Sequence, residues 1–173
     1  MTFDQLTGTL VDFVRAHQAW APLIVGALAF GESLAVLSLL IPATVMLLAI
    51  GGIIGGIGLD FWPIWGGAVV GAFLGDWVSY EVGRHYGDAI RHSWPLNKQE
   101  AMVARGEDYI RRWGVGGVFV GRFFGPLRAI VPLVAGVFEM SRGLFQLANF
   151  ASALLWAFLM LAPGAGLLEW LRG

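Results

Sequence analysis

Residues 121–136, GRFFGPLRAIVPLVAG, place two arginines and two prolines in an otherwise apolar stretch. Residues 31–42, GESLAVLSLLIP, have the same spacing: a glycine and a charged residue, followed ten residues later by a β-branched residue and a proline. Proline removes a backbone donor and forces its predecessor out of helical geometry, so each stretch predicts a broken helix. The stretches begin 90 residues apart, about half the chain, which predicts two opposed re-entrant helical hairpins in an inverted repeat.

The composition indicates an all-α integral membrane protein. Of the 173 residues, 57% are hydrophobic and 13% are charged, whereas a soluble domain carries about 25% charged residues. A net charge of −1 argues against a nucleic-acid partner, which requires a basic patch. Because the chain has no cysteine, it has no disulfide, thiolate metal site or cysteine nucleophile.

The apolar segments predict a single multi-pass domain in the cell (inner) membrane. A spanning helix needs about 20 predominantly apolar residues. Two segments, 61–83 and 143–168, meet that length without a proline in their middle. Six of the eleven Lys and Arg residues lie in the connection after the first of them, so the positive-inside rule places this connection in the cytoplasm. The predicted segments are an amphipathic interfacial helix (1–17), a first broken hairpin (20–58), a spanning helix (61–83), the polar connection (84–112), a second broken hairpin (113–139) and a spanning helix (143–168).

Apart from Glu81 and Glu139 near segment ends, four charged residues fall inside the apolar segments: Glu32, Asp76, Arg122 and Arg128. Each charge near the bilayer centre costs roughly 2.5–3.5 kcal/mol, so these side chains cannot face lipid. They form either two structural ion pairs or a hydrated cavity that receives a charged headgroup. Arginine binds phosphate oxygens bidentately, so two arginines on either side of Pro126 suit a phosphate. In the second interpretation, Glu32 is a titratable carboxylate.

The helix predicted over 61–83 carries two further patterns. Tyr80 and Arg84 follow Asp76 at four-residue intervals, so Tyr80 can contact both neighbours. A stripe of small residues beside them predicts close packing of another helix, within the chain or in a second copy. The stripe consists of Gly67, Gly71, Gly75, Ser79 and Gly83.

The sequence predicts no enzyme, no metal and no cofactor. His85 and His92 lie without a third ligand nearby, and Ser33 has no histidine base in its segment. The HExxH, Walker and GxGxxG motifs do not occur.

Taken together, these motifs resemble the DedA family of membrane proteins, also called the SNARE-associated or VTT domain, over roughly residues 20–165. The resemblance implies two re-entrant hairpins that face each other and move phospholipid-type molecules between leaflets. Bacterial members are associated with return of undecaprenyl phosphate and with the proton motive force, and eukaryotic relatives are lipid scramblases. The matching motifs are Gly31-Glu32 before Ile41-Pro42, Gly75-Asp76 with Tyr80, Gly83-Arg84 and Gly87, and Gly121-Arg122-Phe123 with Pro126, Arg128, Pro132 and Gly136, followed by Asn149 and Trp156.

The resemblance also implies roles for single residues. It places Glu32, Arg122 and Arg128 at the family's functional acidic and basic positions, and Asp76 and Arg84 in its central helix motif. Many members carry an aspartate shortly after the first hairpin's proline, where this chain has Thr44, a neutral hydroxyl that argues against proton coupling through a carboxylate pair.

We therefore expect a lipid translocase that moves a phosphorylated lipid, such as undecaprenyl phosphate or a phospholipid. The alternatives are a proton-coupled small-ion or drug antiporter and a non-transport partner of a lipid phosphatase. The expected partners are a lipid with a phosphate headgroup, protons, and a second copy of the chain or a lipid phosphatase. The candidate substrate-binding residues are Glu32, Thr44, Asp76, Tyr80, Arg84, Arg122, Arg128 and Asn149.

Overall fold

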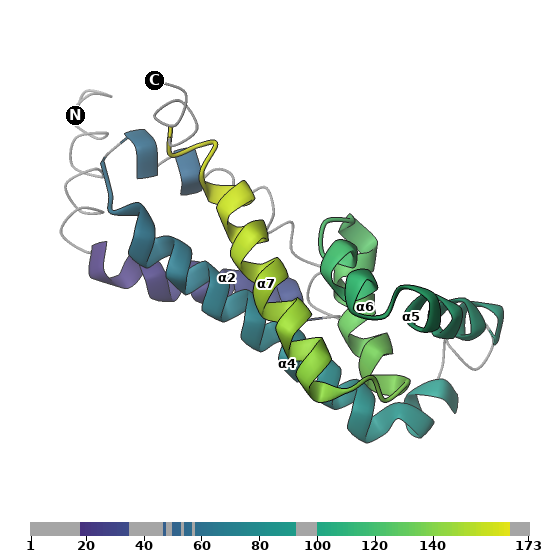
Figure 1. The fold of residues 1–173 in the computed structure, drawn as a ribbon. Coiled ribbons are helices and arrows are strands. Elements are labelled where there is room, and N and C mark those ends of the chain that lie inside the picture. The colour runs from purple at the N-terminus through teal and green to yellow at the C-terminus, as the bar shows by residue number, and fades with distance from the viewer. Residues whose placement is uncertain are drawn as a thin grey trace.

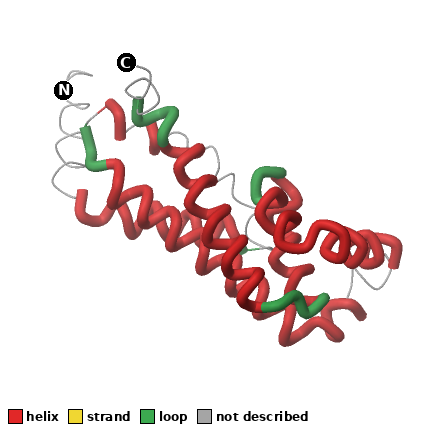
Figure 2. The backbone as a smooth tube through the Cα atoms, viewed as in Figure 1, coloured by secondary structure: helices red, strands yellow, loops and turns green. Residues whose placement is uncertain are grey.

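The computed structural model describes residues 18–34, 47, 50–52, 54–56, 58–92 and 100–166. These residues form helices and turns, and no strand occurs among them (Figure 2). The named elements are η1 (Gln18–Trp20), α2 (Ala21–Ser33), α4 (Phe61–His92), α5 (Glu100–Gly121), α6 (Gly125–Val137) and α7 (Arg142–Leu161). The predicted helix over 1–17 and the part of the first hairpin over 35–46, including Ile41, Pro42 and Thr44, lie outside the described residues.

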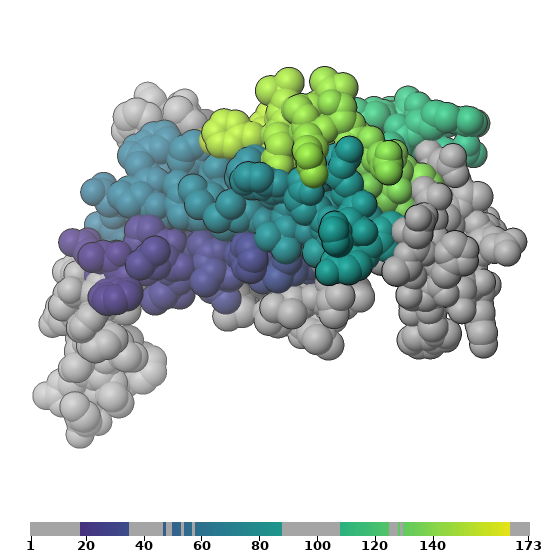
Figure 3. Space-filling model, turned by 90° about the horizontal axis from the view of Figure 1, so that it is seen from below, coloured from purple at the N-terminus to yellow at the C-terminus, as the bar shows by residue number. Residues whose placement is uncertain are grey.

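Helix α4 is the element on which the described helices assemble. Helices α2, α6 and α7 each pack against it (Figure 1). Helix α2 lies along α4 in the space-filling view as well (Figure 3). Helix α5 packs against α6 and α7, which both pack against α4. This arrangement brings the C-terminal end of α2 and the first turn of α6 to the same central helix.

Glycine residues allow these helices to approach closely. A β-carbon added at Gly67 or Gly71 would overlap the backbone of Pro22 or Gly26 in α2. A β-carbon at Gly83 would overlap the carbonyl oxygen of Leu133 in α6. The small-residue stripe predicted from the sequence is therefore confirmed as a packing surface, and its partners lie within the same chain.

Two predicted helix ends are wrong. Helix α4 continues beyond Gly83 to His92, with one non-helical residue at Tyr86 (φ −108°, ψ 18°), so part of the predicted polar connection is helical. Helix α7 ends at Leu161 instead of 168. The chain turns there because Pro163 resists helical continuation and Gly166 adopts φ +69°.

The second broken segment is interrupted beside Pro126, between the two arginines, and not at Pro132. Pro132 lies inside α6, which continues through it although Pro132 has no N–H to donate. The interruption is the turn before α6, where the N–H groups of Phe123 and Phe124 donate to the carbonyls of Val120 and Gly121. Pro126 stands in the first turn of α6, where a missing donor is tolerated. The re-entrant placement and the inverted repeat stay predictions.

Helix α5 changes direction at Gly114, whose φ of +45° and ψ of −123° interrupt the helix. The Oη of Tyr109 spans this bend and donates to the carbonyl of Gly117 at 2.9 Å. Burial raises the pKa of the Tyr109 phenol, so this donor keeps its proton at neutral pH.

Within the described residues, one helix, Arg142–Leu161, is long and apolar enough to cross a membrane by length and composition.

Candidate functional site

The four charged residues predicted inside the apolar segments form two buried ion pairs. Glu32 lies near the end of α2, Asp76 in α4, Arg122 in the turn before α6 and Arg128 in the first turn of α6. Glu32, Asp76 and Arg122 are only 4–5% exposed. We call this set of four residues the double ion pair.

The first pair joins the turn before α6 to the middle of α4. The Nη2 of Arg122 donates to Oδ2 of Asp76 and, at 2.7 Å, to Oδ1 of Asn149. Asn149 in turn donates from Nδ2 to the carbonyl of Phe73 at 3.0 Å. Because Asn149 is fully buried, its amide fixes Arg122 between α4 and α7.

The second pair joins the two halves of the chain. Nη1 of Arg128 donates to Oε1 of Glu32 at 2.7 Å, although the residues are 96 positions apart. The guanidinium of Arg128 also lies over the ring of Trp156, 4.8 Å from its centroid. Arg122 lies 6.0 Å from the same ring, so one buried tryptophan of α7 faces both arginines.

The two carboxylates and two guanidinium groups of the double ion pair balance one another in charge. Breaking a buried ion pair leaves an uncompensated charge and costs about 3–5 kcal/mol, so neither pair separates unless another charge takes over. Among the residues that the structure describes, the buried Nε of Arg122 has no hydrogen-bond acceptor. A phosphate offers several acceptor oxygens at once, which suits two guanidinium groups that lie near the same tryptophan ring.

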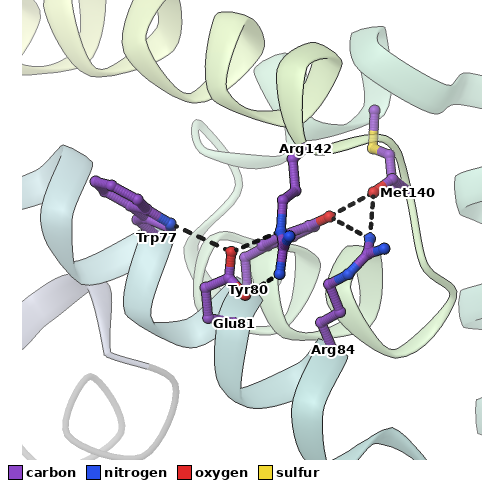
Figure 4. Close-up of polar contacts among 6 residues, drawn as sticks. All are labelled: Trp77, Tyr80, Glu81, Arg84, Met140 and Arg142. Carbon is purple, nitrogen blue, oxygen red and sulfur yellow. Dashed lines mark hydrogen bonds and ion pairs between the residues drawn. The ribbon is translucent and has the colours of Figure 1, made fainter.

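Tyr80 and Arg84 lie at a separate contact. Both donate to the carbonyl of Met140, from the Tyr80 hydroxyl and, at 3.3 Å, from Nη1 of Arg84 (Figure 4). The same Nη1 donates to Tyr80 Oη at 3.0 Å, so the predicted Tyr80–Arg84 contact is confirmed. The turn that they hold contains Glu139 at φ +53°, a conformation that is uncommon outside glycine. These two residues therefore anchor the turn between α6 and α7.

Replacing Tyr80 with phenylalanine should lower the stability of the folded protein by about 1 kcal/mol, because a partly buried hydrogen bond to Met140 is lost. The ring of Tyr80 stacks on Phe145 with centroids 4.2 Å apart, and phenylalanine keeps that contact. Thermal unfolding in detergent measures the difference. The control is Tyr86→Phe, because Tyr86 is exposed; an equal decrease in Tm for both variants would contradict the assigned role.

The candidate residues thus form two separate contact groups, and one candidate lies outside the described residues. Glu32, Asp76, Arg122, Arg128 and Asn149 lie together, Tyr80 and Arg84 hold the turn, and Thr44 is outside the described residues. Trp156 is the contact that the candidate list missed. Its signal in the sequence is its position in the middle of a segment free of charge, whereas most other tryptophans lie near segment ends.

No group of three or more His, Asp or Glu residues that could hold a metal ion occurs in the described part of the chain.

Comparison with known proteins gives one family and several relatives. The VTT domain matches residues 41–166. The inner membrane protein YabI of Escherichia coli is 33% identical over 156 residues, which are 90% of this chain and 61% of YabI. The uncharacterized membrane protein BU139 of Buchnera aphidicola is 28% identical over 90% of this chain and 60% of its own length. The inner membrane protein YqjA of Escherichia coli is 30% identical over 55% of this chain and 44% of its own length.

The chain therefore spans about three fifths of the length of the first two of these relatives. No solved structure matches it.

Proposed function

Because this chain belongs to the VTT domain family, also called the DedA family, we propose that it moves a phosphorylated lipid between the two leaflets of the membrane. The chain is a protein of the cell (inner) membrane. The lipid we propose is undecaprenyl phosphate or a phospholipid. The observation that supports this function is the double ion pair, which gathers two arginines from one short segment in the interior of the protein.

The proposed substrate contact is an exchange of partners at Arg128. A phosphate oxygen replaces the carboxylate of Glu32 on Nη1, while the ring of Trp156 keeps the guanidinium in place. Arg122 contributes its Nε, because its Nη2 already donates to Asp76 and Asn149. The displaced Glu32 carboxylate must then take up a proton or meet water, since a buried charge without a partner is costly.

This function requires no covalent bond to be made or broken. The barrier to lipid flipping is the transfer of a charged headgroup through hydrocarbon, and a protein lowers it by offering paired charges along the way. The two arginines of the double ion pair offer such a partner for the phosphate, while the lipid's tail stays in the bilayer.

The test is a flipping assay in proteoliposomes with a fluorescent phospholipid or a labelled polyprenyl phosphate. Arg128→Gln should slow flipping about tenfold or more, because one charge-assisted hydrogen bond to the phosphate is worth about 1.5–3 kcal/mol. The matched control is Arg111→Gln, since Arg111 is an exposed arginine paired with Asp108 at 3.3 Å. Equal rates for the wild type and a folded Arg128→Gln variant would contradict the proposed site.

Two further measurements distinguish the proposed translocase from the two alternative functions. A proton-coupled antiporter would show a pH-dependent ion flux that Glu32→Gln removes and Arg128→Gln leaves intact. A partner of a lipid phosphatase would flip no lipid by itself and would co-purify with the phosphatase.

A further inference from the structure

A shallow groove of about 530 Å³ lies on the surface, and no residue of the double ion pair lines it. Its lining comes from α4 beyond Asp76 and from Arg142, the first residue of α7. Figure 4 shows three of the lining side chains, Trp77, Glu81 and Arg142. Trp77 and Glu81 extend from α4 toward Arg142 of α7 in this view. The residues that line the groove are Trp77, Val78, Glu81, Val82, Tyr86 and Arg142.

The polar part of the groove is an accessible ion pair without net charge. Arg142 donates from Nε and Nη2 to the two carboxylate oxygens of Glu81, each at 3.1 Å. Trp77 donates from Nε1 to the same carboxylate at 3.4 Å. The side chains of Arg142 and Glu81 are 63% and 38% exposed, so a ligand can reach both charges.

The remaining surface of the groove is apolar and aromatic. Val78 and Val82 are exposed on α4 between Trp77 and Tyr86. Arg142 is the first residue of the helix that is long and apolar enough by length and composition to span a membrane. If that helix crosses the bilayer, the groove at its first residue lies near the headgroup level. Aromatic rings are enriched at that level, and their faces attract cations.

We propose that this groove binds the headgroup of a zwitterionic phospholipid. Its phosphate pairs with Arg142, and its ammonium group pairs with Glu81 and lies against the aromatic rings of Trp77 and Tyr86. The exchange replaces one ion pair by two and leaves no charge without a partner. The two valines contact the start of an acyl chain.

The charges of the groove favour a zwitterion over an anionic lipid. A lipid that carries only a phosphate would separate Arg142 from Glu81 and place a second negative charge beside that carboxylate. The phosphate of an anionic lipid and the carboxylate of Glu81 are both negative and repel each other, so the anionic lipid binds more weakly than the zwitterionic one. The groove and the double ion pair consist of different residues. Lipid binding at the groove can therefore be disproved while lipid translocation is shown, and the reverse.

The test is native mass spectrometry of the purified full chain with phosphatidylcholine or phosphatidylglycerol added in detergent. The wild type should retain phosphatidylcholine, and Glu81→Gln/Arg142→Gln should bind it about tenfold more weakly, because both charged contacts are lost. The matched control is Asp108→Asn/Arg111→Gln, which neutralises another exposed pair and should bind as the wild type does. Circular dichroism and size-exclusion chromatography verify that both double variants are folded.

Three results would overturn the inference. The first is equal retention of phosphatidylcholine by the wild type and the groove variant. The second is equal binding of phosphatidylglycerol and phosphatidylcholine by the wild type. The third is a change in oligomeric state of the groove variant without a change in lipid binding, which would indicate a second copy of the chain as the occupant.

Discussion

Replacing Arg122 with alanine is expected to lower the stability of the folded protein severely and to abolish its flipping activity. The substitution leaves Asp76, which is 5% exposed, as a buried carboxylate without its arginine, and Asn149 loses a donor. Removing one partner of a buried pair costs about 3–5 kcal/mol, a large share of a stability of about 5–15 kcal/mol. The yield of monodisperse protein in detergent and its Tm measure this loss.

The double variant Asp76→Asn/Arg122→Gln separates the two interpretations of the pair. Two amides can hydrogen-bond to each other and to Asn149, so this variant should recover most of the folded yield. It lacks the guanidinium that the proposed phosphate contact needs and should therefore flip lipid at least about tenfold more slowly than the wild type. A folded double variant with wild-type flipping would show that the pair is purely structural.

Replacing Gly71 with valine is expected to separate α2 from α4. The new β-carbon would overlap the carbonyl oxygen of Gly26, and neither backbone can yield without moving its helix. Overpacking a core costs about 1–3 kcal/mol where side chains can adjust, so a clash between two backbones should cost about 3 kcal/mol or more. Because Glu32 belongs to α2, its pair with Arg128 should also be displaced, and flipping should be lost with stability.

Gly66→Val is the control for this prediction. A β-carbon at Gly66 meets nothing within 4 Å, and both substitutions change helix propensity equally. A comparison of the two Tm values in the same detergent therefore isolates the contact with α2. Similar Tm values for the two variants would contradict the proposed packing.

Much of the site could be predicted from the sequence because charge in an apolar segment is a local signal. Glu32, Asp76, Arg122 and Arg128 stand out from their neighbours, and the cost of burying them requires that each has a partner. The small-residue stripe is also local, because glycines at four-residue spacing define one face of a helix. The structure confirms both the burial of Glu32, Asp76 and Arg122 and the packing of the stripe.

The positions of the breaks were less predictable. The sequence predicted breaks at both Pro126 and Pro132, yet α6 continues through Pro132 and the turn lies only before Pro126. A proline costs a helix one hydrogen bond and some strain, and packing of α6 on α4 at Gly83 and Gly136 outweighs that cost. Tertiary packing against the central helix thus decided where the chain bends.

The sequence by itself determined that this is a helical membrane protein with four charges that need partners in its interior. It contained no information on which acid meets which base, because Arg122 reaches Asp76 across 46 residues and Arg128 reaches Glu32 across 96. The tertiary structure alone decided those pairings and the position of Trp156 beside both arginines. It also decided that Tyr80 and Arg84 donate hydrogen bonds to the carbonyl of Met140. The physical reason is that periodicity and hydropathy describe one helix at a time, whereas each of these contacts depends on how α2, α6 and α7 pack on α4.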